Sequence, residues 1–278
     1  MSADGLSDVL DAGVTHVWWG TVTGPLGLDA TAVLSAAERE RAYAMTAEAG
    51  LHYAGAHVAV RRILARYLDT DPGLLRLGRL RCPECEGTDH GAPCVLWPPT
   101  ELSYSLSRSG AHWLLGVTGG GRRIGVDLEE VLGFDVDTTA PTVLSDRELA
   151  RLRERTTAEG RLEVFLRYWT RKEAVLKASG VGLMTDLRAV DVDEGAAAPG
   201  TPLVVRHSAA RGPGSWTVED LSIGPGRYAA IAREATAAGP LRLIGSTHPS
   251  VHHRPPVPAG AGTRSTPWPS ATSSLSTT

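Results

Sequence analysis

Two acidic side chains, Asp127 and Glu129, are separated by a single residue in the segment 125–130. If this segment is a strand, both carboxylates lie on one face, while Val126 and Leu128 face the opposite side, toward a core. Two neighbouring carboxylates repel each other unless a cation lies between them. Because oxygen ligands favour Mg²⁺, the pattern indicates a divalent metal site; the alternative is a half-exposed strand with solvated acids.

A second group of polar side chains lies in the segment 165–178, which has the composition of a helix. At about 100° per residue, four of its side chains fall within a sector of roughly 140° on one face. They are Trp169, Lys172, Glu173 and Lys177. The alternative interpretation is a solvated helix face on which Glu173 and Lys177 form an ordinary i,i+4 pair.

Together the two segments predict chemistry on a phosphate or pyrophosphate ester. If Glu173 points toward Asp127 and Glu129, three carboxylates would hold one Mg²⁺ and leave positions for phosphate oxygens and water. Lys172 and Lys177 are the only lysines among 28 basic residues, all others being arginine. Lysine is a compact ammonium that suits phosphate or proton chemistry, and a carboxylate would accept a proton from the nucleophile.

Length and composition exclude several other classes. A chain of 278 residues suggests two domains or two lobes of one fold, and its net charge of -3 argues against a strongly basic nucleic-acid binder. No apolar stretch approaches the roughly 18 residues of a membrane-spanning helix, and the N-terminus lacks the layout of a signal peptide. The three cysteines, all within 82–94, suit a reducing compartment. We therefore expect a cytoplasmic protein with no nucleic-acid and no membrane partner.

Apolar periodicity predicts the elements that must position these side chains. In the first half it predicts two helices, one that opens on a capping box at Ser35–Glu38 and runs to Met45, and one over 52–68. A loop rich in Cys, Pro and Gly is expected over 81–100. Strands are expected over 14–23, 102–105, 113–117 and 123–131, with a turn at Ser109–Gly110.

The second half is predicted to be helical over 145–178, opening on another capping box at Ser145–Glu148. Strands are then expected around 189–192, 203–206, 215–221 and 227–232. Each half thus passes from strand through helix and back to strand, which permits a pseudo-duplicated α+β architecture. Residues 245–278 contain no acidic side chain and are rich in Ser, Thr, Pro, Ala and Gly, which predicts a disordered tail.

The two polar segments resemble the signature blocks of the 4'-phosphopantetheinyl transferase superfamily, in its large two-lobed class. The specific part is Asp-x-Glu at 127–129 followed by Trp-x-x-Lys-Glu-x-x-x-Lys at 169–177. Weaker similarities extend over roughly 14–235 and include segments 34–39, 57–64, 90–93 and 105–107. The resemblance implies two pseudo-symmetric α+β lobes with an active-site cleft between them. They would be an N-terminal lobe over 1–117 and a C-terminal lobe over 118–244 that carries the metal site, followed by the tail 245–278.

The resemblance also implies a reaction. The family transfers the 4'-phosphopantetheine group of coenzyme A to a serine of an apo acyl or peptidyl carrier protein and releases adenosine 3',5'-bisphosphate. By position, Asp127, Glu129 and Glu173 match its Mg²⁺ ligands, and Glu173 would accept the serine proton directly or through a water. Lys177 matches the lysine at the leaving phosphate, while Lys172 and Trp169 would shape the helix face. With both lobes in one chain, a monomer is expected.

Three positions on the coenzyme side depart from the family pattern. Arg108 follows Ser107 where the family normally has histidine, although arginine can bind phosphate bidentately. Ala92 occupies a position that is commonly basic, and His52 is the one candidate for the basic residue that approaches the 3'-phosphate. The expected substrate-binding residues are therefore His52, Ser107, Arg108 and Trp169. The alternative function is a catalytically impaired member that binds a carrier protein or coenzyme A, against which the retained acidic cluster argues.

Two further alternatives remain open. One is another Mg²⁺-dependent enzyme acting on a nucleotide pyrophosphate, although no Walker-type loop is present to support triphosphate hydrolysis. The other concerns Cys82, Cys85, His90 and Cys94, which could form a tetrahedral zinc site. A zinc knuckle has four residues before its last cysteine, whereas this loop has three, and His90 and Pro93 also fit the loop of the transferase family.

Overall fold

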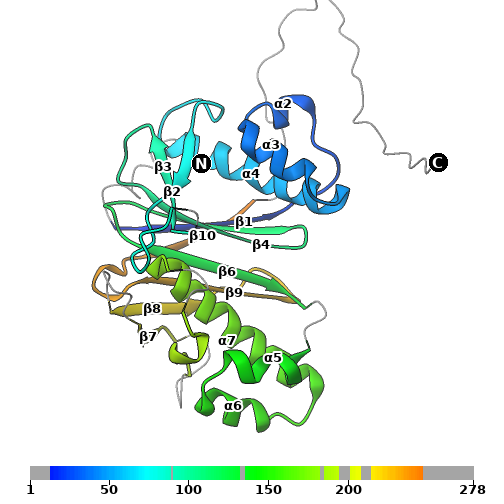
Figure 1. Ribbon diagram of the computed structural model, residues 1–278, viewed down its shortest axis with the longest axis vertical. Coiled ribbons are helices and arrows are strands. Elements are labelled where there is room, and N and C mark those ends of the chain that lie inside the picture. Colours follow the sequence, from blue (N-terminus) through cyan, green and yellow to red (C-terminus); the bar gives the residue numbers. More distant parts are fainter. Residues whose placement is uncertain are drawn as a thin grey trace, which may run out of the picture.

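The computed structural model describes residues 13–88, 90–131, 135–181, 185–193, 201–207 and 214–246. They form two sheets that lie between two long helices, α4 (Ala47–Tyr67) and α7 (Ala158–Ser179), so that the molecule has four layers (Figure 1). Helices segregated to the outer faces of largely antiparallel sheets define an α+β fold, as predicted. Within the described ranges, no helix combines the length and the apolar content needed to cross a bilayer.

The first sheet has six strands in the order β10-β1-β5-β4-β3-β2. Their bounds are Thr15–Thr21 for β1, Arg76–Arg79 for β2, Pro93–Trp97 for β3, Ser103–Ser109 for β4, His112–Thr118 for β5 and Leu241–Ser246 for β10. Neighbours pair antiparallel except β1 and β10, which are parallel. The predicted turn between β4 and β5 is confirmed, with Gly110 at a φ of 53° that favours glycine.

The second sheet has four antiparallel strands in the order β6-β9-β8-β7. They are β6 (Ile124–Glu130), β7 (Leu203–Arg206), β8 (Ser215–Asp220) and β9 (Arg227–Glu234). The remaining elements are α2 (Leu28–Thr31), α3 (Ala36–Tyr43), α5 (Val136–Val143), α6 (Asp146–Arg153), and the 3-10 turns η2 (Leu187–Ala189) and η3 (Ala235–Ala237). Both predicted capping boxes, at Ser35 and Ser145, are present.

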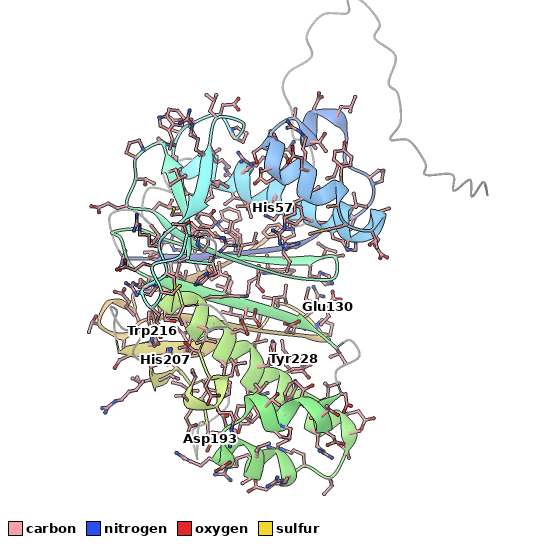
Figure 2. All side chains as sticks on the ribbon, in the orientation of Figure 1. His57, Glu130, Asp193, His207, Trp216 and Tyr228 are labelled. Carbon is pink, nitrogen blue, oxygen red and sulfur yellow. The ribbon has the colours of Figure 1, made fainter. Side chains whose placement is uncertain are left out.

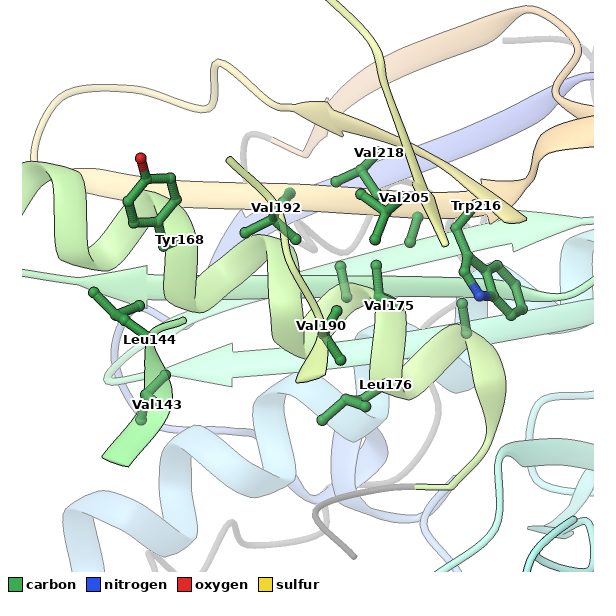
Figure 3. Packing of buried hydrophobic residues seen from close by; sticks show 14 of the residues in the cluster. Val143, Leu144, Tyr168, Val175, Leu176, Val190, Val192, Val205, Trp216 and Val218 are labelled. Atoms are coloured by element: carbon green, nitrogen blue, oxygen red, sulfur yellow. The ribbon is translucent and has the colours of Figure 1, made fainter. Parts of the chain in front are cut away.

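Apolar side chains fill all three spaces between the four layers. One cluster lies between α4 and the six-stranded sheet, and another packs α7 against the four-stranded sheet and includes Val175, Leu176 and Trp216 (Figure 3). The third joins the two sheets and includes Leu114 of β5 and Val126 of β6. Successive residues of β5 therefore face different layers, as the period of a strand requires.

Three predictions of local structure were wrong. The expected loop over 81–100 contains β3, and Gly245 and Ser246 of the expected tail belong to β10, while 247–278 lie outside the described residues. No strand forms at 189–192. Val190 and Val192 are buried there, but their backbone groups bond to side chains instead of to a neighbouring strand: Val192 N donates to Glu148, and Val190 O accepts from Lys172.

Candidate active site

A close approach between β6 and α7 builds the site. Along β6, Ile124, Val126 and Leu128 enter the apolar cluster between the sheets, so Gly125, Asp127 and Glu129 face α7. A Cβ atom at Gly125 would lie 2.0 Å from the carbonyl oxygen of Ala174. Glycine at this position therefore lets α7 lie directly on the strand that carries the two acids. The predicted orientation of the β6 side chains is confirmed.

A row of serines on β4 holds the other side of β6. Ser105, Ser107 and Ser109 alternate along β4 and so share one of its faces. The hydroxyl oxygen of Ser105 accepts from Val126 N at 3.1 Å, and that of Ser109 accepts from Glu130 N at 3.1 Å. The hydroxyl of Ser107 donates to Asp127 and that of Ser109 donates to Glu129, the two acids of β6. This serine row connects the first sheet to the edge of the second.

Asp127 is 3% exposed and lies at the centre of the site. Its Oδ1 accepts from the Ser107 hydroxyl at 2.9 Å and from the Lys177 ammonium at 2.5 Å. Lys177 Nζ also donates to the Ser107 oxygen at 3.0 Å. Among the described residues, Oδ2 of Asp127 is buried without a hydrogen-bond partner. One oxygen of this carboxylate thus accepts two hydrogen bonds, whereas the other has lost its water and gains no hydrogen bond in return.

Glu129 is oriented by two donors. The indole Nε1 of Trp169 donates to its Oε1 at 3.1 Å, and the Ser109 hydroxyl donates to its Oε2 at 3.2 Å. Burial, together with the nearby charge of Asp127, raises the pKa of Glu129 to about 7, although Trp169, Ser109 and Lys177 act in the opposite direction. The structure therefore brings Trp169 to the acidic site, where it orients a carboxylate.

Glu173 faces the same site from α7. Its Oε1 is buried and has no hydrogen-bond partner among the described residues. Burial and the charge of Asp127 raise the pKa of Glu173 to about 7, with Lys177 lowering it. Glu129 and Glu173 therefore both titrate near neutrality, because three carboxyl groups in a desolvated site cannot all ionise without compensation.

The donor set of this site suits Mg²⁺. Asp127, Glu129 and Glu173 offer only hard oxygen ligands, and the orphaned oxygens of Asp127 and Glu173 lack the positive partner that a cation would supply. The three carboxylates lie on one site but do not converge tightly. Across the described ranges, the one group of three potential ligands whose atoms all lie within 4.8 Å of one another is elsewhere, in the loop after β2.

Lys172 does not belong to this face, which corrects the prediction. Its side chain is 0% exposed, with Nζ 2.7 Å from Oε2 of Glu148 and in contact with the carbonyl oxygens of Leu187 and Val190. The reason is angular: Lys172 and Lys177 lie at opposite ends of the predicted sector of roughly 140°, so only one of them can face β6. Lys172 forms a buried ion pair with Glu148 of α6.

Next to the acids lies a cavity of about 390 Å³ whose walls include α4, β4 and α7. Glu173 and Lys177 line it together with three arginines, Arg41, Arg79 and Arg108. The cavity is therefore rich in positive charge, which favours an anionic ligand. Another cavity, of about 340 Å³, is lined by residues that include Thr170, Asp220 and Arg227, and it contains none of the predicted site residues.

Two stacked rings line the cavity below Arg108. The rings of Tyr53 and His57 are 3.9 Å apart and nearly parallel, and the Arg108 guanidinium lies 4.8 Å from the Tyr53 ring centre. Figure 2 marks His57 on α4. Burial lowers the pKa of His57 to about 4, so the imidazole is neutral at physiological pH. The aromatic surface thus lies beside a cation, an arrangement that suits a ligand with both ring and phosphate groups.

The predicted substrate-binding residues do not all line the cavity. Arg108 lines the cavity, whereas Ser107 contacts Asp127 and Lys177. His52 is not among the lining residues, and its electrostatic influence falls on His112 instead. Arg41 and Arg79 were missed, because in a chain that uses arginine for nearly all its cations no single arginine stands out.

Comparison with known proteins shows what the chain is similar to. Residues 123–232 match the family model of the 4'-phosphopantetheinyl transferase superfamily, a segment that contains all of β6 and α7. A phosphopantetheinyl transferase of Thraustochytrium sp. is 32% identical over 186 residues, which cover 60% of this chain and 62% of that protein. The 4'-phosphopantetheinyl transferase HetI of Nostoc sp. is 32% identical over 127 residues, 45% of this chain and 49% of that protein.

A putative 4'-phosphopantetheinyl transferase of Synechocystis sp. is 33% identical over 140 residues, covering 49% of this chain and 52% of that protein. The chain thus spans about half to three-fifths of the length of these curated relatives. Over residues 123–232 the chain is thus similar to the 4'-phosphopantetheinyl transferase superfamily, the family that its motifs resemble.

Proposed function

We propose that this protein is a Mg²⁺-dependent phosphopantetheinyl transferase that acts on coenzyme A and the serine of an apo acyl or peptidyl carrier protein. One observation carries the proposal: Glu173 and Lys177, adjacent to the buried Asp127, form one wall of a cavity that also contains three arginines. A metal-binding set and an anion-binding set therefore meet at one place. Both belong to a single chain, which supports a monomeric enzyme, and we further propose a cytoplasmic location.

The cationic wall supports coenzyme A as the donor. Arg41, Arg79 and Arg108 offer planar donor groups for its phosphates. Ala92 leaves the turn at 91–93 without the basic side chain expected of the family. Arg79 supplies a cation beside that turn, where its Nη1 donates to the Gly91 carbonyl at 2.8 Å.

Asp127, Glu129 and Glu173 would hold the metal ion. When bound, Mg²⁺ would neutralise charge on the pyrophosphate and polarise it for attack. Glu173 would accept the proton of the carrier serine. At the same time the serine oxygen would bond to the β-phosphorus and the pyrophosphate P–O bond would break. A carboxyl group whose pKa lies near the working pH is suited to this task.

Lys177 would stabilise the leaving adenosine 3',5'-bisphosphate through its ammonium group. Its side chain is 30% exposed and reaches the cavity, so it can move from Asp127 toward an anion there. Ser107 acts as a positioning residue, because it bonds both Asp127 and Lys177. Trp169 is a positioning residue for Glu129, to which its indole nitrogen donates.

Mass spectrometry of an apo carrier protein tests this function. After incubation with this protein, coenzyme A and Mg²⁺, the carrier should gain the mass of one phosphopantetheine group. No gain across several acyl and peptidyl carriers, combined with calorimetric binding of coenzyme A, would contradict transfer and favour the catalytically impaired binding protein. No binding of coenzyme A at all would point to another pyrophosphate-containing substrate.

A further inference from the structure

A second group of potential metal ligands lies in the loop between β2 and β3. The sulfurs of Cys82 and Cys85 and a ring nitrogen of His90 all lie within 4.8 Å of one another. Within the group, Cys85 Sγ lies 3.1 Å from His90 Nε2. Cys82 is 1% exposed, whereas Cys85 is exposed, so the group lies at the protein surface with one thiol directed inward.

The loop backbone folds around the two sulfurs. Cys82 and the residues after it form a tight turn, in which Glu86 N donates to Cys82 O at 2.9 Å and Cys82 N donates to Gly87 O at 2.8 Å. Gly87 N points at Cys85 Sγ, 3.4 Å away. Amides directed at sulfur favour the thiolate, the form that binds metals.

We propose that Cys82, Cys85 and His90 bind one zinc ion. Two thiolates and an imidazole are ligands that select Zn²⁺ over the Mg²⁺ expected at the carboxylates. With the usual zinc bond lengths, neighbouring ligand atoms of a tetrahedral site are about 3.6 Å apart. The distance of 3.1 Å between Cys85 Sγ and His90 Nε2 is near that value, and no two ligand atoms of the group are more than 4.8 Å apart.

Cys94 is not one of the ligands in this group, which corrects the four-ligand arrangement that the sequence spacing suggested. It lies in β3, where it pairs with Ser103 of β4, and the strand fixes its position apart from the turn at 82–87. The three-ligand group leaves the fourth coordination position to water, on the side where Cys85 is exposed.

The zinc ion would stabilise one wall of the cationic cavity. His90 and the three residues after it line that cavity, so the ion would tie the turn at Cys82 to this wall. The base of the loop is already closed, because Leu80 N donates to Ala92 O at 2.8 Å. Zinc would therefore fix the outer part, between residues 82 and 90. If the proposed transferase function holds, zinc removal should raise the KM for coenzyme A more than it lowers kcat.

Metal analysis of the whole chain tests the site without any assay of activity. Protein expressed with zinc and dialysed without chelator should retain about one zinc per chain. Cys85→Ser and His90→Gln should lose it, and Cys94→Ser is the matched control that should keep it. Retention of zinc by Cys85→Ser, or its loss from Cys94→Ser, would overturn the assignment.

Cobalt binding to the unsubstituted chain provides a readout that needs no variant to fold. Under reducing conditions, Co²⁺ added to zinc-depleted protein should produce a thiolate-to-metal charge-transfer band that zinc then abolishes. The absence of this band, together with the absence of zinc in the purified protein, would overturn the proposal. An intact mass lower by two hydrogens without reductant, in Cys94→Ser as well as in the unsubstituted chain, would indicate a Cys82–Cys85 disulfide instead. The band depends on metal binding alone, so it distinguishes failure of the zinc site from failure of the transferase function.

Discussion

The ammonium group of Lys177 lies 2.5 Å from Oδ1 of Asp127, the carboxylate most deeply buried in the acidic site. The family resemblance gives these residues different partners, a phosphate for the lysine and a metal for the aspartate. The lysine engages only Oδ1, and Oδ2 of the same carboxylate is buried without a hydrogen-bond partner among the described residues. Mg²⁺ would therefore bind Asp127 through Oδ2, beside the lysine.

Replacing Glu173 should separate catalysis from folding. Glu173→Gln removes the proposed proton acceptor, and we expect transfer to fall by about 10²-fold or more. Because Oε1 of Glu173 has no partner among the described residues, the neutral amide should leave the fold intact. Steady-state transfer rates and thermal unfolding check the two effects. The control is Glu163→Gln, at an exposed position of the same helix. Equal activity of the two variants would contradict the assignment.

The stability of the protein should depend on pH in a way that Mg²⁺ alters. In the folded protein the pKa values of Glu129 and Glu173 are raised to about 7. The protonated groups therefore stabilise the folded state when the pH is below the pKa of the unfolded chain, and this contribution is lost as the pH rises through 7. Mg²⁺ should compensate the charges that then appear. We expect the gain in Tm from MgCl₂ over NaCl of equal ionic strength to be larger at pH 8 than at pH 6. An equal gain at both values would argue against carboxylate ligands.

Arg108 should contribute to coenzyme A affinity. Arg108→Ala removes a cation that lies over Tyr53 in the cavity, and we expect the KM for coenzyme A to rise about tenfold, or about 1.4 kcal/mol, with a smaller change in kcat. Arg108→Lys keeps the charge but not the planar group and should be intermediate. Arg147→Ala, at an exposed arginine of α6, serves as the control. An unchanged KM in Arg108→Ala would place the phosphates elsewhere.

Gly125 should tolerate no side chain. In Gly125→Ala the new methyl group would overlap the Ala174 carbonyl, pushing α7 away from β6 and costing about 1–3 kcal/mol of unfolding free energy. Transfer activity should fall by more than the loss of folded protein accounts for, because Asp127 and Glu173 would separate. Denaturant unfolding checks the first effect. Gly27→Ala, where an added Cβ meets nothing within 4 Å, should change stability by less than about 0.5 kcal/mol.

Lys172 should prove structural. Lys172→Met leaves the buried carboxylate of Glu148 without its cation and should cost about 3–5 kcal/mol. Adding Glu148→Gln removes the second charge and keeps an acceptor for one of the two backbone amides that Glu148 serves, Ser145 N and Val192 N, so the double variant should recover part of the stability. It should also recover transfer activity. A well-folded double variant without activity would instead support the catalytic role that the sequence suggested.

Sequence periodicity predicted the elements of the acidic site because that site depends on local geometry. The alternation of β6 placed Asp127 and Glu129 together, and the spacing in α7 placed Glu173 with Lys177. Lys172 was misplaced because its surroundings depend on the segment 187–192, which lies close only after folding. Arg41 and Arg79 were missed for the same reason, since their elements meet the cavity only through tertiary packing.

Non-local pairing also explains the errors in the fold. The strand β10 pairs with β1, more than 200 residues earlier, so neither sequence segment alone indicates the partnership. Val190 and Val192 have the composition of a strand, but they are buried against α7, and their backbone groups bond to Glu148 and Lys172. Burial produced the apolar pattern there without any sheet.

The serine row has a consequence for solubility. β6 lies at the end of its sheet, where unpaired backbone amides could recruit a strand from another molecule. The hydroxyl oxygens of Ser105 and Ser109 accept from the amides of Val126 and Glu130, so this edge is covered from within the molecule. The strand that carries Asp127 and Glu129 is thereby protected from intermolecular β-pairing and aggregation.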